Sequence, residues 1–341
     1  GAIIKPSFCG PCFGAGDVPA NDGLSIRHTT RNFPNREGSK PSDGQLAGVA
    51  LMDARSIAAT AANGGVITAA TDIEYEVPNH EYHFDKTVYR NRIYYGYGKA
   101  DPNAELILGP NITDWPAMEA LTDNMLVELA AVIRDPVTTT DELIPSGETS
   151  SYRSNPLRLS EFALSRRVPE YVGRSKAIHT LDLARQNGES PEKLVTALSR
   201  FGDAAALLKN TQFGSCVFAN RPGDGSAREQ AASCQKVLGG YANICYEYAT
   251  KRYRSNCINW GILPFTLPEG ADFPYGEGDF VFIPDVRAKI AAGDTDFPAK
   301  VLTKDGSVSD ILLQIIGLTD EEKTIILDGC LINYYAEQNK R

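Results

Sequence analysis

The sequence has no apolar run near about 18 residues, the length that a membrane-spanning helix needs, so we expect no membrane span. It also lacks a dense block of lysine or arginine, because 43 acidic residues outnumber 34 basic ones and the formal net charge is −9. That balance disfavours binding to nucleic acid or to an anionic membrane. The first residues show no signal-peptide pattern, and we expect a cytoplasmic protein.

Several common catalytic signatures are missing as well. The sequence contains no Walker loop, no GxGxxG after a strand and no Ser-His-Asp order, which excludes the usual nucleotide-binding and serine-hydrolase patterns. The four histidines are scattered and we assign none of them to a metal site; they are His28, His80, His83 and His179. Internal repeats and low-complexity tracts are also absent.

Cysteine is present in an odd number, seven, without the spacing of a small disulfide-rich domain. This pattern indicates a reducing compartment and mostly free thiols. Five of the cysteines lie in apolar stretches and are expected to be buried as small hydrophobic residues; they are Cys216, Cys234, Cys245, Cys257 and Cys330. Only Cys9 and Cys12 are spaced to act together.

The motif Cys9-Gly10-Pro11-Cys12 therefore raises a question of chemistry. A thioredoxin-type switch needs its CxxC at the start of a helix inside a βαβ unit, and the residues around Cys9 do not predict that frame. The same spacing fits two corners of a metal or iron–sulfur site, but no second CxxC accompanies it. From spacing alone a ligand pair, a redox pair and a plain tight turn all stay open.

The chain of 341 residues is long enough for two domains and for a sizeable core. Strand and helix patterns alternate along it, which predicts an α/β fold. Residues 73–124 are polar, aromatic and rich in proline and asparagine, which is typical of a connecting segment over the surface. We expect helices over residues 46–65, 157–167, 191–208 and 318–338, strands over 66–71, 124–135, 278–285 and 299–303, a strand–turn–helix over 213–235 and a strand–helix over 240–261.

Two polar loops carry arginine in a form that suits anions. RHTTRNFPNREGS places Arg27, Arg31 and Arg36 around a Pro-Asn turn, where two guanidinium groups can grip one carboxylate. The sequence alone favours a plain solvated basic loop there. The loop over residues 138–162 is rich in serine and threonine and holds Asp141 and Arg153; it is either a functional loop or a surface loop in which Asp141 caps a turn.

The stretch RPGDGSAREQAAS at 221–233 is the most informative. Ser226 and Glu229 match the S-x-x-E capping box, which predicts that Ser226 begins a helix, caps it, and receives a return bond from Glu229. The functional interpretation uses the same position, since a serine at a helix N-terminus lies among free backbone N–H donors that stabilise an anion. Arg228 is placed to add a positive charge, and the two interpretations are compatible.

Taken in order, these motifs resemble the C-terminal half of the aconitase superfamily of iron–sulfur hydro-lyases. CGPC resembles the family's CxxC, TTRNFPNR is similar to its NRNF-x-x-R loop, and TTTD with the later YRSN resembles its TTD…Arg stretch. GDGSAREQAA is similar to the family's G-x-G-S-S-R-E-H-A, and the segment LGGYANICYEYATKRYRSNCINWGILPF continues in register. The resemblance covers most of the chain.

The resemblance implies a particular architecture. It predicts the end of a three-layer α/β/α cluster-binding domain at residues 1–72, a linker or hinge at 73–124 and a swivelling β/β/α domain at 125–341. It also implies that Cys9 and Cys12 are two of three ligands of a [4Fe-4S] cluster. The family's third cysteine lies upstream of the CxxC, so its N-terminal half is expected in cis or as a separate subunit.

The resemblance further implies a reaction, the dehydration and rehydration of a hydroxy di- or tricarboxylic acid of the citrate and isocitrate type. Ser226 would be the proton-abstracting base, with Asp141 the second catalytic residue. The substrate-binding residues would be Arg31, Arg36, Arg153 and Arg228. Thr30 and Ala227 depart from the family's usual Asn and Ser, so a changed substrate is expected.

Other functions stay open at this point. A non-catalytic binding or regulatory protein could keep the scaffold, although the acidic charge argues against RNA. A redox or zinc role for Cys9 and Cys12 is the further alternative. Without the upstream residues of the family, the chain by itself is expected to be inactive and to lack a complete cluster.

Overall fold

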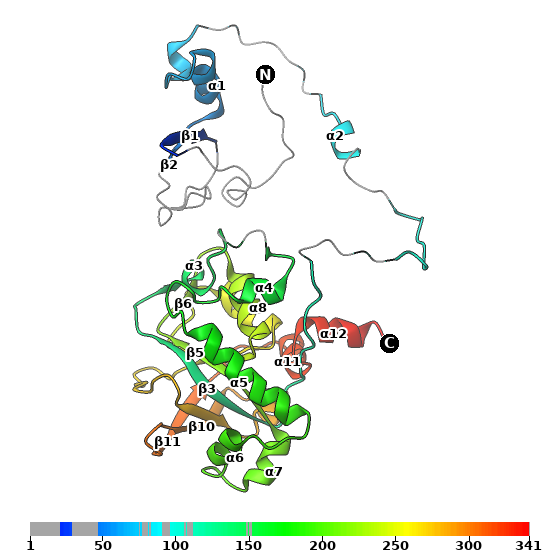
Figure 1. The fold of residues 1–341 in the computed structure, drawn as a ribbon, viewed down its shortest axis with the longest axis vertical. Helices are drawn as coiled ribbons and strands as arrows, with labels where there is room; N and C mark the ends of the chain where they lie inside the picture. Colours follow the sequence, from blue (N-terminus) through cyan, green and yellow to red (C-terminus); the bar gives the residue numbers. More distant parts are fainter. Residues whose placement is uncertain are drawn as a thin grey trace. The chain divides into compact units, whose positions relative to one another are not determined.

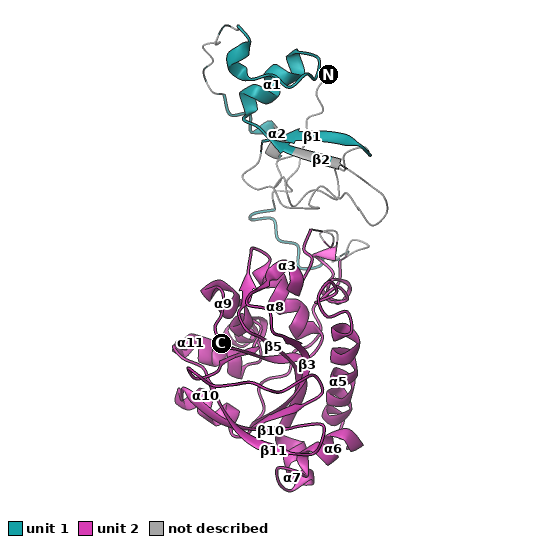
Figure 2. Ribbon diagram, turned by 90° about the vertical axis from the view of Figure 1, so that its left-hand side faces the viewer, with its two compact units in different colours: residues 1–110 teal, residues 111–341 magenta. Residues whose placement is uncertain are grey.

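The structure, a computed structural model, divides into two compact units, Gly1–Pro110 and Asn111–Arg341 (Figure 2). Each unit is described by itself. The described residues are 21–28, 47–74, 76, 81, 83–90, 96–105, 107, 112–147, 149 and 152–340. None of the helices in these ranges is both long and apolar enough to cross a membrane.

The first unit contains a parallel strand pair, β1 (Gly23–Arg27) with β2 (Ala47–Leu51), and helix α1 (Ala54–Ala62). The prediction of one helix over 46–65 is wrong at its start. Asp53 caps α1 by accepting the backbone N–H groups of Arg55 and Ser56, so the helix begins there and the preceding residues pair as a strand. The predicted C-terminus holds, because Gly64 follows in the left-handed region with φ 63°.

The end of this unit is less regular than predicted. The expected strand over 66–71 is absent, and residues Ala70–Asp72 form a short 3-10 helix instead. Helix α2 (Thr87–Arg90) is a single turn within the predicted connecting segment. The described residues of that segment up to residue 107 are almost all exposed, as expected of a surface connection.

A closed seven-stranded barrel forms the centre of the second unit (Figure 1). Its parallel part runs β3 (Asn124–Ile133), β5 (Thr211–Ala219), β7 (Gly240–Cys245) and β8 (Leu263–Thr266). Its antiparallel part is β9 (Phe280–Ile283), β10 (Asp296–Leu302) and β11 (Val308–Gln314), and these strands join β3 to β8. The prediction of an α/β fold is confirmed.

The barrel has an apolar interior and a second apolar layer beneath the outer helices. Met125, Val127 and Leu129 of β3 belong to the interior cluster, which draws residues from all seven strands, while Leu126 belongs to the cluster that includes the helices. This alternation follows from the two-residue period of a strand. A register shift between Leu129 and Ala131 then reverses the phase, because one extra residue turns every later side chain to the other face.

Helices cover the outside of this barrel. The longest is α5 (Tyr171–Gln186), which packs along β5 and β3 and was not predicted from the sequence. Three predictions agree closely with the structure. The strand predicted over 124–135 is β3, the strand–turn–helix over 213–235 is β5 with α8 (Arg228–Val237), and the strand–helix over 240–261 is β7 with α9 (Lys251–Asn259). The remaining long elements are α10 (Val286–Ala292), α11 (Asp320–Leu327) and α12 (Leu331–Gln338).

Three predicted helices are shorter or divided. The helix expected over 191–208 is divided into two, α6 (Glu192–Leu198) and α7 (Ala204–Asn210), because Asp203 accepts backbone N–H bonds that begin a second helix. Pro191 is the N-cap of the first. Over 157–167 only α4 (Pro156–Ser160) is regular. The helix expected over 318–338 begins with a capping box formed by Thr319 and Glu322. It is divided into α11 and α12 near Gly329, which has φ 92°.

The break at Gly329 is held by close backbone packing. An added Cβ at Gly329 would overlap the carbonyl oxygen of Glu119, and one at Gly261 would overlap the carbonyl oxygen of Gly329. Both glycines have positive φ, where other residues are strained. Three parts of the chain therefore touch one another at Gly261 and Gly329: the segment 112–120, the end of α9 and the start of α12.

We predict that Gly261→Ala lowers the free energy of unfolding by roughly 3 kcal/mol, since it combines left-handed strain with overpacking. Gly270→Ala is the matched control, because Gly270 has φ 76° but open space where a Cβ would lie. It should cost only about 1 kcal/mol. Urea unfolding of both variants checks the difference, and equal midpoints would contradict it.

Candidate functional site

Two turns that lie far apart in the sequence meet at one end of the barrel. β4 (Thr138–Thr139) follows β3 and pairs in parallel with β6 (Pro222–Asp224), which follows β5. Since β3 and β5 are parallel neighbours, their carboxyl ends lie at the same edge, where ligands bind in open α/β sheets. α3, α4, α8 and β6 all gather at this end in Figure 1. The sequence-predicted residues Asp141 and Ser226 therefore lie on adjoining turns.

The first turn leads into α3 (Thr140–Leu143), which Thr139 begins with a capping box closed by Glu142. Asp141 lies in the first turn of this helix and forms an ion pair with Arg166, with 2.6 Å between Arg166 Nη1 and Asp141 Oδ2. The alternative in which Asp141 itself caps the turn is wrong, because Thr139 does so. Asp141 is half-exposed, and its carboxylate is held at the edge of the site.

Thr140 joins the two turns directly. Its side chain is buried, and its hydroxyl oxygen accepts the backbone N–H of Ala227 at 3.3 Å. Gly225 approaches the same hydroxyl so closely that an added Cβ would overlap it, and Gly225 has φ 131°. Only glycine fits this conformation and this contact. Thr140 thereby fixes the turn that presents Ser226.

Ser226 does not cap the helix that follows it, so the capping-box prediction is wrong. α8 begins at Arg228, its N-cap is Ala227, and no side chain caps it. Glu229 instead accepts the indole N–H of Trp260 at 3.1 Å. Ser226 is exposed, and its hydroxyl makes no hydrogen bond to any described residue. The hydroxyl is consequently available, next to the unpaired backbone N–H groups of the first helical turn.

Arg228 is the cation closest in sequence to this hydroxyl. It is half-buried, and its Nε is buried without a hydrogen-bond partner among the described residues. A buried guanidinium N–H without an acceptor is costly, and a bound anion would supply one. Arg228 therefore has the features of a ligand-binding side chain.

Arg153 comes to the same end through the packing of α4 on α8. It is exposed and donates from Nη2 to the carbonyl oxygen of Ser146 at 3.3 Å, a weak contact that leaves most of its donors for another partner. Asn155 caps α4 by accepting the backbone N–H of Arg158, which fixes the end of the loop that carries Arg153.

The four other predicted site residues, Cys9, Cys12, Arg31 and Arg36, lie outside the described residues, and their roles stay predictions. Sequence reasoning missed Thr140 and the Glu229–Trp260 contact. The sequence TTTD contains Thr140, but nothing in it indicates that the hydroxyl reaches a turn 87 residues later. Trp260 also packs on Trp115, with ring centroids 4.4 Å apart.

The described cysteines do not fit an iron–sulfur cluster. Cys216, Cys234, Cys245, Cys257 and Cys330 are all free and buried, which confirms their expected packing role. Burial raises the pKa of the Cys257 thiol to about 12 and also raises the pKa of Cys216, Cys234 and Cys245. A cluster ligand must be a thiolate, and no group of three metal-ligating side chains occurs in the described part of the chain.

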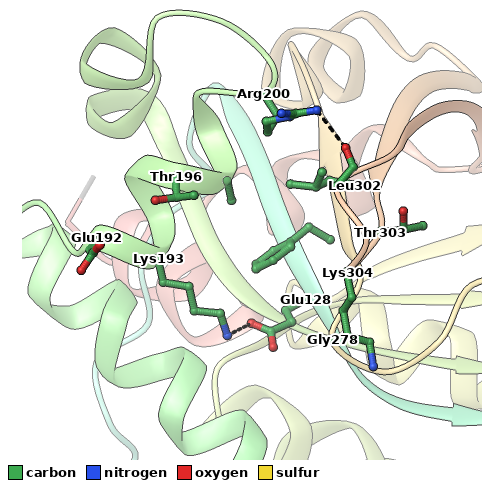
Figure 3. Close-up of a pocket in the computed structure, with 12 residues that line it drawn as sticks. Glu128, Glu192, Lys193, Thr196, Arg200, Gly278, Leu302, Thr303 and Lys304 are labelled. Carbon is green, nitrogen blue, oxygen red and sulfur yellow. Dashed lines mark hydrogen bonds and ion pairs between the residues drawn. The ribbon is translucent and has the colours of Figure 1, made fainter.

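A hollow of about 740 Å³ lies elsewhere, between α6 and the strands β9 and β10 (Figure 3). Two of its three cations, Lys193 and Arg200, already have partners: Lys193 pairs with Glu128 at 2.5 Å, and Arg200 donates to the carbonyl oxygen of Gly306 at 2.8 Å. None of the predicted site residues lines it. The hollow is therefore separate from the site formed by the turns of Asp141 and Ser226, which we call the carboxyl-end site.

Comparisons with known proteins point to one family. The aconitase C-terminal domain family matches residues 178–270. Aconitate hydratase A of Bradyrhizobium diazoefficiens is 28% identical over 176 residues, which cover 46% of this chain and 19% of that protein. A protein named as a mitochondrial aconitate hydratase in Emericella nidulans is 23% identical over 303 residues, covering 80% of this chain and 35% of that protein.

This chain thus spans about a fifth to a third of the length of these relatives. Among solved structures, 3-isopropylmalate dehydratase of Methanocaldococcus jannaschii aligns with 18% identity and a TM-score of 0.38. That alignment covers 64% of this chain and 96% of the other.

We predict that Thr140→Val loosens the turn at Ser226, because it leaves the Ala227 N–H buried without an acceptor while it preserves the shape of the side chain. Stability should fall by about 1–3 kcal/mol, and hydrogen exchange at the Ala227 amide should speed up at least tenfold. Thr140→Ser keeps the hydroxyl and should leave the exchange rate within about threefold of wild type. Unchanged exchange in Thr140→Val would show that the bond does not hold the turn.

Proposed function

We propose that the chain is part of an aconitase-like hydro-lyase, since residues 178–270 match the aconitase C-terminal domain family. Its substrate would be a hydroxy di- or tricarboxylic acid of the citrate and isocitrate type. In this proposal Ser226 is the general base, with Asp141 as the second catalytic residue. Arg153 and Arg228 bind substrate carboxylates, as do Arg31 and Arg36.

One observation carries the proposal. The turn before α8 exposes a serine hydroxyl without a hydrogen-bond partner in the described structure, two residues before an arginine whose Nε is buried and unpartnered. A structural cap would have used the Ser226 hydroxyl, and a structural ion pair would have used Arg228. Neither occurs, which supports a role for both in binding a carboxylate substrate.

The chemistry places clear demands on these residues. Removal of a proton next to a carboxylate leaves negative charge on that carboxylate, and arginine N–H donors stabilise the charge where it develops. Ser226 takes the proton as general base. A helix N-terminus supplies only about 0.3–2 kcal/mol, and one pKa unit needs about 1.36 kcal/mol. The helix alone therefore cannot activate the serine, and the charge of Arg228 is needed as well.

The position after Ser226 bears on substrate choice. Ala227 is buried, and its N–H is taken by Thr140, so this residue offers neither a hydroxyl nor a free amide to a substrate. The family commonly has a second serine here. A substrate would receive one hydrogen bond fewer at this position, which favours a hydroxy acid other than citrate.

A cluster would supply a Lewis acid for the departing hydroxyl. Cys9 and Cys12 are the proposed ligands on the resemblance alone. The described residues hold no set of side chains that fits the cluster.

We predict that Ser226→Ala lowers kcat by about 10²–10⁴-fold, the range that a general base contributes, with little change in KM. The assay follows hydration and dehydration of hydroxy di- and tricarboxylic acids by the full-length, anaerobically reconstituted protein. Ser199→Ala is the matched control, since Ser199 is an exposed serine at the end of α6, and it should keep wild-type activity.

Full activity of Ser226→Ala on the best substrate would show that the base assignment is wrong. If no hydroxy acid turns over but one binds at the carboxyl-end site, the chain belongs to a binding protein that keeps the scaffold.

A further inference from the structure

A second cavity lies at the opposite end of α8 from Ser226. It has a volume of about 440 Å³ and is enclosed by the segment 116–119, α5, the last turn of α8 and the start of β7. Its polar lining comes from Glu119, His179, Gln186 and Lys236. Lys236 follows Arg228 by eight positions on α8, which is about 12 Å along a helix, so this cavity is separate from the carboxyl-end site.

Lys236 is the unusual member of this lining. Its side chain is buried, with only 3% of the residue exposed. Its Nζ lies 4.7 Å from the centre of the Tyr241 ring, but no described residue accepts a hydrogen bond from it or forms an ion pair with it. An ammonium group has three N–H donors, and on a residue this enclosed they favour a bound acceptor. Lysine is among the residues least often buried without a partner.

The acids nearby are already committed to another cation. Arg185 donates from Nη2 to both carboxylate oxygens of Glu119 at 2.8 Å and from Nε to Asp182 at 2.7 Å. Asp182 is fully buried and also accepts the backbone N–H of Phe213 and the hydroxyl of Tyr241. Arg185 and its two acids therefore form a closed network, and Lys236 is left outside it.

The rest of the cavity is apolar. Pro116, Met118, Leu183 and Val237 supply its walls, together with the ring of Tyr241. Burial lowers the pKa of His179, so its ring is neutral at pH 7 and can donate a hydrogen bond. A mostly apolar cavity with few convergent polar groups is typical of a small-molecule site.

We propose that this cavity binds a small carboxylic acid with an apolar body, its carboxylate against Lys236 and its hydrocarbon part between α5 and the segment 116–119. The ligand would supply the hydrogen-bond acceptor that no described residue gives the Lys236 ammonium. A cavity of about 440 Å³ is large enough for an acid with a short hydrocarbon chain such as hexanoate. The site does not depend on the proposed hydro-lyase activity and would act as a regulatory or carrier site.

The charge on Lys236 supports the same chemistry. Desolvation lowers its pKa to about 8, and the titratable groups that act on it are Glu119, Asp182 and Cys330. His179 and Tyr241 complete the titratable lining. A bound carboxylate favours the charged amine, so binding should weaken as the pH rises through about 8 and the amine loses its proton.

The experiment compares hexanoate with 1-hexanol, a probe of the same length without charge, by calorimetric titration of the full chain at pH 7. Hexanoate should bind at least tenfold more tightly than hexanol. Lys236→Met, which keeps the volume of the side chain, should weaken hexanoate at least tenfold and leave hexanol within about twofold. Lys209→Met, an exposed lysine on α7, is the control and should bind like wild type.

Ala117→Phe provides a second test that keeps Lys236. Ala117 is an exposed residue of the cavity lining, so a phenyl ring there should narrow the opening and weaken both probes. Equal hexanoate affinity in wild type and Lys236→Met would overturn the proposal, as would a hexanol affinity that matches hexanoate. If Lys236→Met fails to fold, unchanged hexanoate binding in Ala117→Phe overturns it.

Discussion

The parallel pairing of β4 with β6 is the contact on which the candidate site depends, because it joins two turns that follow different strands of the barrel. Thr140 adds the decisive hydrogen bond, from the Ala227 N–H to its hydroxyl, and presses against Gly225. Through Ala227, the residue just before α8, this bond ties the start of the helix to another segment. The Ser226 hydroxyl has no hydrogen-bond partner among the described residues.

The barrel makes this pairing possible. β3 and β5 are parallel neighbours, so the turns that leave them emerge at the same edge. The alternation of β3 between the barrel interior and the helix-covered layer fixes the rotation of the strand, and the shift after Leu129 sets the direction in which the chain leaves it. A site built on such turns has rigid support from two apolar layers.

Much of the second unit could be predicted from the sequence, because strong periodicity over β3, β5–α8 and β7–α9 left few alternatives. α5 could not, since its sequence carries buried charge: Asp182 and Arg185 look like a solvated face until Glu119, from a distant segment, completes the network. The C-terminal helix likewise broke where backbone from residues 119 and 261 approaches Gly329, a contact that no local pattern encodes.

The candidate site shows the same limit. The sequence indicated Ser226, Arg228, Asp141 and Arg153, and the structure brings their turns together at one edge. It also indicated a capping box at Ser226 that does not form, because the carboxylate of Glu229 accepts the indole N–H of Trp260 instead of returning to the Ser226 backbone. The competing partner is a tertiary contact, which outweighs a local signal worth about 1 kcal/mol.

The central claim is that the guanidinium of Arg228, whose Nε has no partner among the described residues, binds a substrate carboxylate. A titration of the full chain with the hydroxy di- or tricarboxylic acid that the full-length protein turns over best tests it most directly. Arg228→Gln should weaken binding of that acid at least tenfold, as expected for the loss of a charge-assisted pair. Arg252→Gln, an exposed arginine on α9, should bind it as wild type does. Equal affinity in wild type and Arg228→Gln would contradict the account.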